Sequence, residues 1–150
     1  DQLLWPLHVA GDGESRSDSS KSVRYLGRLS HADLLGEMTR AAIFAHAALY
    51  EPFGLAVLEA AKAGCCLVLS DIPSLRELWN GAAVFVDARD EVGWIEKLNG
   101  LTNNDAERER LGHQASRHAE RYKSETTISA YHDLYESVVS KRHPDNGVAA

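Results

Sequence analysis

Two glutamates separated by seven residues, Glu51 and Glu59, are the side chains of this sequence best suited to chemistry. A proline follows Glu51 directly, and the residue before a proline is pushed out of the helical region, so we expect Glu51 in a loop. The residues from Leu55 onward are good helix formers, and Gly64 is a typical C-terminal stop. The sequence therefore predicts a helix from about Gly54 to Gly64, with one acid before it and one inside it.

The start of this helix has no obvious side chain to cap it. No Ser, Thr, Asp or Asn stands in the loop just before Leu55, so the first backbone N–H groups are left for water or a ligand. Such a helix end binds phosphate well. Glu59 is the only acid in a helix that is apolar almost all round, which predicts a buried carboxylate in need of a diol or an arginine. The residues fit equally well a helix that frays at its start, with Glu59 at the protein edge.

A pair of carboxylates is also the usual set of catalytic residues in a glycosidase. That chemistry needs both acids to flank one glycosidic bond at a set separation. Glu59 lies about two turns into the helix from Glu51, which is on the order of 10 Å along the axis. This separation and the different surroundings of the two acids argue against a glycosidase.

Short apolar segments alternate with helical ones along the chain, which predicts a doubly wound parallel α/β sheet. The expected strands are 3–10, 23–27, 43–48, 66–70 and 83–86, and the expected helices are 32–42, 54–64, 72–78, 91–101, 105–122 and 124–139. Ligands of such sheets bind beyond the carboxyl ends of the strands. The residues that follow strands include Gly11, Gly27, Glu51 and Asp71. We expect them to converge on one rim of the sheet.

The composition is that of one soluble globular domain, which we place at residues 1–140. The Ser-rich segment 14–22 is expected to be a loop, and residues 141–150 a disordered tail. A net charge of −6 does not indicate the basic surface patch that nucleic-acid binding needs. Cys65 and Cys66 are adjacent in an apolar run and indicate no disulfide framework. No signal peptide and no long apolar run are visible, so we expect a cytoplasmic protein whose membrane contact, if any, comes from another part.

The run Y-E-P-F-G-L-A-V-L-E-A-A-K-A-G at 50–64, followed by L-V-L-S-D-I-P-S-L-R-E-L at 67–78, resembles a known family. It is similar to the donor-binding half of retaining glycosyltransferases of the GT-B fold, in particular glycosyltransferase family 4, with the glycogen synthases as relatives. The resemblance extends from about Leu7 to about Tyr135, nearly the whole chain. Two spaced acids alone would be weak evidence, but the combined run is specific.

The resemblance implies transfer of a sugar from a nucleotide-diphosphate donor to an acceptor hydroxyl, with retention at the anomeric carbon. It implies that Glu51 contacts the donor sugar or stabilises charge beside the reacting centre, and that Glu59 holds the ribose hydroxyls. Backbone N–H groups around Phe53, Gly54 and Leu55 are implied to meet the sugar and the diphosphate. No metal and no cofactor are implied, since the helix end and basic groups neutralise the leaving phosphate.

Two further loops are implied to contact the donor. The glycine at the Gly11 position lets the backbone approach the diphosphate in the resembled family. The loop after Gly27, here Arg28 and Leu29, reads the nucleobase largely through its backbone. From the residues alone, Arg28 is as well explained as a surface ion-pair partner. His46, at the end of an expected strand, is more simply explained as a structural histidine than as a ligand contact.

The chain also departs from the family pattern. The family's C-terminal half begins with a strand and helix that carry an Arg and a Lys for the diphosphate, and this chain starts after them. The acceptor-binding N-terminal domain, which would meet an acceptor sugar or lipid, is absent as well. We therefore expect an N-terminally truncated half of a GT-B fold that is inactive alone and self-associates through exposed apolar surface and an open strand edge. Two rival functions remain, a non-catalytic nucleotide-sugar-binding module and a GT-B sugar-nucleotide epimerase.

Overall fold

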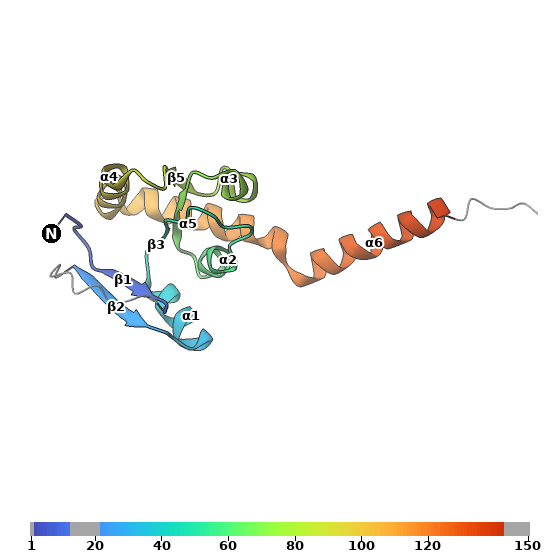
Figure 1. Ribbon diagram of the computed structural model, residues 1–150, viewed down its shortest axis with the longest axis horizontal. Coiled ribbons are helices and arrows are strands. Elements are labelled where there is room, and N and C mark those ends of the chain that lie inside the picture. The colour runs from blue at the N-terminus through green and yellow to red at the C-terminus, as the bar shows by residue number, and fades with distance from the viewer. Residues whose placement is uncertain (1, 13–21, 143–150) are drawn as a thin grey trace, which may run out of the picture. The chain divides into compact units, whose positions relative to one another are not determined.

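The computed structural model describes residues 2–12 and 22–142, and the chain divides into two compact units, Asp1–His118 and Ala119–Ala150 (Figure 1). The strands of the first unit are β1 (Leu7–Ala10), β2 (Val23–Gly27), β3 (Ile43–His46), β4 (Cys66–Ser70) and β5 (Val84–Val86). The helices are α1 (His31–Arg40), α2 (Leu55–Lys62), α3 (Pro73–Trp79), α4 (Glu91–Thr102), α5 (Asp105–Ala119), the 3-10 turn η1 (Glu120–Tyr122) and α6 (Ser124–Arg142). Every expected strand and helix is present, with ends that differ by a few residues. The predicted loop at 14–22 falls almost wholly on residues 13–21, which lie outside the described residues.

All the described strands pair in parallel, which confirms the predicted α/β class. They form two sheets, one with the order β1-β2 and one with the order β3-β4-β5. The sequence predicted a single sheet without indicating this division. The strands are divided into two sheets because, within the described segments, no strand pairs with the free edge of β1 or of β3. The predicted self-association through open edges stays a prediction.

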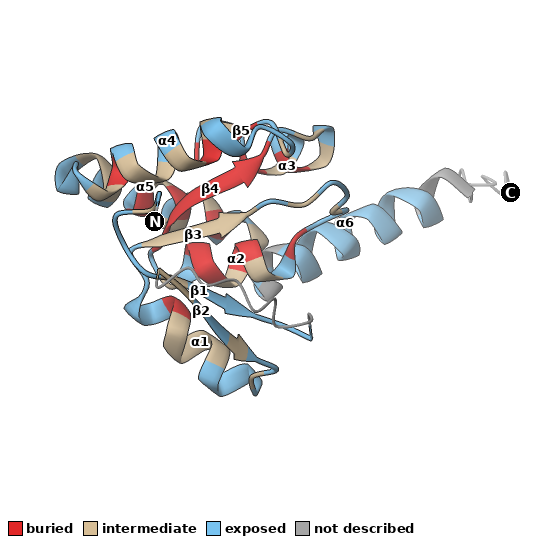
Figure 2. Cartoon of the chain, turned by 60° about the vertical axis from the view of Figure 1, so that its left-hand side comes forward, coloured by how far each residue is buried: buried red, intermediate tan, exposed pale blue. Residues whose placement is uncertain are grey.

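The core of the first unit is built around β4, which is buried along its whole length (Figure 2). Its run C-L-V-L-S is continuously apolar up to Ser70, as expected for a parallel strand covered on both faces. One side of the strand packs in a cluster that joins it to β5, α4 and α5. The buried members of this cluster are Cys66, Val68, Val86, Trp94, Leu101 and Leu111. Strand β4 is thus the central buried strand of this unit, and the loops at its ends are anchored to it.

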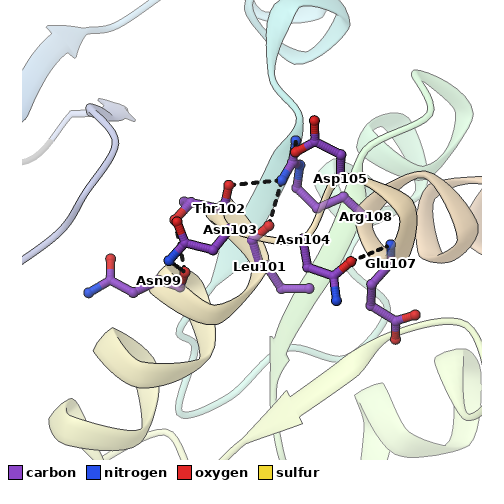
Figure 3. A network of polar contacts seen from close by, with 8 residues as sticks. All are labelled: Asn99, Leu101, Thr102, Asn103, Asn104, Asp105, Glu107 and Arg108. Atoms are coloured by element: carbon purple, nitrogen blue, oxygen red, sulfur yellow. Dashed lines mark hydrogen bonds and ion pairs between the residues drawn. The ribbon is translucent and has the colours of Figure 1, made fainter.

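The junction of α4 and α5 is closed by one arginine (Figure 3). Arg108 Nη1 donates to the carbonyls of Leu101 and Thr102, at 2.6 and 3.1 Å, and Nη2 pairs with Asp105 at 2.7 Å. The last carbonyls of a helix have no intrahelical partner, so the guanidinium satisfies groups that would otherwise be left open. The same group lies 4.6 Å from the centroid of the Trp5 ring, which ties the N-terminal segment to this junction.

The second unit consists chiefly of α6, which continues to Arg142, two residues into the predicted disordered tail. Its large apolar side chains are exposed (Figure 2). They are Ile128, Tyr131, Leu134, Tyr135, Val138 and Val139. Residues 143–150, the rest of the predicted tail, lie outside the described part. In the segments that the structure describes, no helix combines the length and apolarity needed to span a bilayer.

We predict that Gly112→Ala destabilises the protein whereas Gly100→Ala does not. A Cβ on Gly112 would lie 2.4 Å from the carbonyl oxygen of Gly64, so helix α5 or the turn after α2 has to move. Overpacking of this kind costs about 1–3 kcal/mol. A Cβ on Gly100 meets nothing within 4 Å, and alanine favours a helix over glycine by roughly 1 kcal/mol. Urea unfolding of both variants measures the difference, and equal midpoints would contradict the contact.

We also predict that Cys65 and Cys66 resist alkylation in the folded protein. Burial raises the pKa of both thiols to about 11, so neither forms the reactive thiolate at pH 8. In the unfolded chain the pKa is near 9, so the unfolded state loses thiol protons first as the pH rises. Stability is therefore unchanged by these groups below pH 9 and falls between pH 9 and 11. Thiol titration with and without urea, and unfolding as a function of pH, test both parts.

Candidate functional site

The N-terminus of α2 is built around Gly54, which has a φ of 79° and no side-chain cap. A Cβ at this position would lie 2.9 Å from Val57 Cγ2, so only glycine fits. The first amide with a helical partner is that of Leu58, which donates to the Gly54 carbonyl at 3.0 Å. The amides of Leu55, Ala56 and Val57 donate to no group in the described part of the chain. The predicted open helix end is therefore present.

Glu51 lies in the predicted loop and folds back onto its own turn. Its Oε1 accepts from the amide of Gly54 at 2.8 Å and from that of Phe53 at 3.3 Å. The expectation that the first amides of the helix are left for water or a ligand is therefore wrong for Gly54, where the predicted helix begins. The usual capping residues are short, and the pattern did not reveal that a glutamate three residues earlier reaches the same donors.

Two residues from neighbouring elements lie against Glu51, and a third contacts one of them. Ser74, in α3, donates its hydroxyl to the Glu51 carbonyl at 2.6 Å. His46, at the end of β3, places Nε2 3.4 Å from Glu51 Oε2. Ser70, at the end of β4, donates to the carbonyl of His46 at 3.2 Å. Sequence reasoning missed both serines because single hydroxyls carry no spacing signal, and it treated His46 as structural.

The sequence left open whether Glu59 is buried or lies at the protein edge, and the structure favours the edge. Its side chain is 30% exposed, and its Oε1 lies 3.7 Å from Nδ1 of His31 at the start of α1. The buried alternative does not hold because α2 buries only one face, through Val57, Leu58 and its alanines. Glu59 therefore stands at a partly accessible position beside α1, and its neighbour there is a histidine instead of an arginine.

The loops after β1 and β2 lie together. The Gly11 amide donates to the Gly27 carbonyl at 2.9 Å, and both glycines have positive φ. Arg28 lies 3.7 Å from Asp12, and its side chain is 83% exposed. Arg28 thus forms a surface ion pair, which was one of the two interpretations that its sequence position left open. Leu29 is half-buried beside it.

Asp71 follows β4 as predicted, but its carboxylate is fully engaged. Arg76 binds both of its oxygens at 2.6 Å and lies 4.3 Å from the centroid of the Phe85 ring. The guanidinium holds the pKa of Asp71 below its usual value. Asp71 is therefore a structural anchor for α3.

The expected rim thus consists of two groups. Glu51, Phe53, Gly54 and Leu55 form one around the start of α2, and Gly11, Gly27 and Arg28 form the other. The contact of His31 with Glu59 links them, and α1 packs against α2. No hydrogen bond or ion pair within the described segments joins Gly11 or Arg28 directly to Glu51.

Comparisons with known proteins agree with the sequence pattern. A family model described as glycosyl transferases group 1 matches residues 5–118. A D-inositol 3-phosphate glycosyltransferase of Corynebacterium jeikeium is 30% identical over 126 residues, which cover 83% of this chain and 30% of that protein. A glycogen synthase of Mycobacterium tuberculosis is 33% identical over 120 residues, covering 73% of this chain and 29% of that protein. This chain therefore spans about 30% of the length of these curated relatives.

Solved structures share the fold at lower identity. The Anabaena protein HepE, in complex with UDP and glucose, superposes with a TM-score of 0.72 at 18% identity, covering 90% of this chain and 40% of that one. A sucrose-phosphate synthase of Thermosynechococcus elongatus gives a TM-score of 0.71 at 20% identity, with 80% of this chain and 31% of that one covered. The α/β fold of this chain is therefore that of part of these larger proteins.

We predict that Ser74→Ala loosens the Glu51 loop and lowers the free energy of unfolding by about 1 kcal/mol, the contribution of one hydrogen bond. Ser129→Ala, at an exposed position of α6, is the matched control and should change stability by less than about 0.5 kcal/mol. Urea denaturation gives both values. If the two variants lose equal stability, the bond between Ser74 and the Glu51 carbonyl does not hold the loop.

Proposed function

We propose that this chain, which belongs to the group 1 glycosyl transferase family, supplies the donor-binding part of a retaining glycosyltransferase. In this proposal a longer protein carries the chain, and the donor is a nucleotide-diphosphate sugar. The acceptor hydroxyl, of a sugar or a lipid, is bound by a domain outside these 150 residues. We expect no transfer by the 150-residue chain alone.

The observation that carries this proposal is the start of α2. The amides of Leu55, Ala56 and Val57, which have no partner among the described residues, stand at the positive end of a helix dipole, where a phosphate binds. Glu59 follows Leu55 by four residues, about 6 Å along the helix axis. A carboxylate at that distance from a bound phosphate is placed to accept from the hydroxyls of a ribose, as the acid of a dinucleotide-binding fold does.

The proposed reaction breaks the bond between the anomeric carbon and the diphosphate and forms one to the acceptor oxygen on the same face. The proton of the acceptor hydroxyl passes to an oxygen of the leaving phosphate. The amides at the start of α2 stabilise the charge that develops on that phosphate, so the proposal needs no metal. Glu51 acts at the sugar, where its charge favours the positive character that develops at the anomeric carbon.

The similar proteins support the substrate class in different ways. One curated relative is named a glycosyltransferase, at 30% identity, and another a glycogen synthase, at 33% identity. The HepE structure holds UDP and glucose, so a protein with this fold binds the two halves of such a donor. The donor sugar and base of this protein are left for the experiment.

We predict separate roles for the two acids. Glu59→Ala should weaken binding of both the sugar nucleotide and the bare nucleoside diphosphate by about tenfold to a hundredfold, because a hydrogen bond to a charged group contributes roughly 1.5–3 kcal/mol. Glu51→Ala should leave the nucleoside diphosphate nearly unchanged and lower the rate of transfer, because its contact matters where charge develops. Calorimetric titration and initial rates in the longer protein measure both.

Glu59→Gln is the control that keeps shape while removing charge, and a panel of UDP, GDP and ADP sugars identifies the donor. Equal losses for both ligands in both variants would mean that the acids only support the fold. Donor binding without transfer to any acceptor would favour the non-catalytic binding module, and conversion of the donor to an epimer would favour the epimerase.

A further inference from the structure

His46 occupies an unusual position for a histidine with no assigned role. It is the last residue of β3, and its carbonyl accepts from the hydroxyl of the fully buried Ser70 at 3.2 Å. Its ring is stacked with that of Phe44, with centroids 6.2 Å apart and planes 12° apart. The ring is therefore held from two sides, by the strand and by an aromatic neighbour.

The side chain as a whole is 24% exposed, but its Nε2 atom is buried and makes no hydrogen bond of ordinary geometry. A buried polar atom without a partner is costly, and each such atom requires an explanation. The group that Nε2 faces is the carboxylate of Glu51, whose Oε2 is 3.4 Å away. A small rotation of either side chain would bring the two within hydrogen-bond distance.

The two oxygens of Glu51 have different surroundings. Oε1 accepts from the amides of Phe53 and Gly54, which belong to the turn before α2. Within the described segments, the polar contact of Oε2 is with His46. A carboxylate repels the lone pair of an imidazole nitrogen, so a hydrogen bond between the two side chains needs the ring proton on Nε2.

We propose that His46 is a positioning residue for Glu51. Its Nε2–H donates to Oε2 and fixes the direction of the carboxylate, while the turn amides fix Oε1. This inference rests on the proposed function, in which Glu51 acts at the donor sugar. It adds a residue of β3 to a site otherwise formed by loops and by the start of α2.

A fixed carboxylate matters most where charge develops during the reaction. Without His46, Glu51 would still bind the turn amides through Oε1, but Oε2 would be free to rotate about the last side-chain bond. Loss of orientation lowers stabilisation of the transition state more than it lowers binding of the ground state. The expected signature is therefore a fall in kcat with little change in KM.

The first arm of the test asks whether the pair interacts, and it does not depend on catalysis. Urea unfolding of the 150-residue chain is measured for the parent, His46→Leu, Glu51→Ala and the double variant. The proposal predicts that the two changes are not additive, with a coupling of about 3- to 10-fold in the folding equilibrium constant. His132→Leu, at an exposed position of α6, is combined with Glu51→Ala as a matched control and should show additivity.

The second arm uses the longer protein that carries this chain. His46→Leu should lower kcat by about tenfold with KM for the donor unchanged. His46→Gln, whose side-chain amide also carries an N–H donor, should recover most of that loss. In a Glu51→Ala background, His46→Leu should have no further effect on kcat, because a positioning residue acts only through the group it holds.

The outcomes of the two arms separately test the contact between His46 and Glu51, the positioning role of His46 and the proposed function. Additive unfolding energies overturn the contact itself. A clear coupling in unfolding, with an unchanged kcat in His46→Leu, overturns the positioning role while the proposed function stands. A parent protein that binds no sugar nucleotide and transfers no sugar overturns both the proposed function and the positioning role, and only the contact then remains.

Discussion

The hydrogen bond from the Gly54 amide to Glu51 Oε1, 2.8 Å long, is the interaction on which the rest of the site depends. It closes the turn that leads from β3 into α2, and it sets the direction in which α2 begins. Gly54 takes a left-handed conformation at this turn, and the next three amides make no hydrogen bond within the described part of the chain. One side chain thus shapes the loop, and the same side chain is the proposed acid at the sugar.

Much of this arrangement could be predicted from local sequence. The residue before a proline, an apolar helical run and a closing glycine were enough to place Glu51 in a loop and α2 between two turns. The continuous apolar run of β4 correctly indicated a strand buried on both faces. These predictions succeeded because each depends on the conformational preferences of a few neighbouring residues.

Apart from the bond between the Gly54 amide and Glu51, three residues earlier, the failures concern contacts between residues distant in sequence. The exposure of Glu59 depends on which face of α2 is covered, and the sequence of that helix alone does not specify it. The bond from Ser74 to the Glu51 carbonyl joins positions 23 residues apart, and the contact between His31 and Glu59 depends on how α1 packs against α2. Likewise, the alternation of strands and helices predicts parallel pairing but not which strand edges remain open.

The strand pair β1-β2 has a consequence for how tightly any nucleotide is held. The pair is short and largely exposed, and an isolated two-stranded ribbon is only marginally stable (Figure 2). The bond from His8 to Glu37 of α1, at 2.9 Å, is one of its few side-chain attachments. Such a region opens locally at a lower free energy than the core around β4. For a ligand that reaches from Gly27 to Glu59, part of the binding free energy is offset by the cost of keeping the β1-β2 pair closed. Amide hydrogen exchange in β1 and β2 would therefore slow on binding, while exchange in β4 would not change.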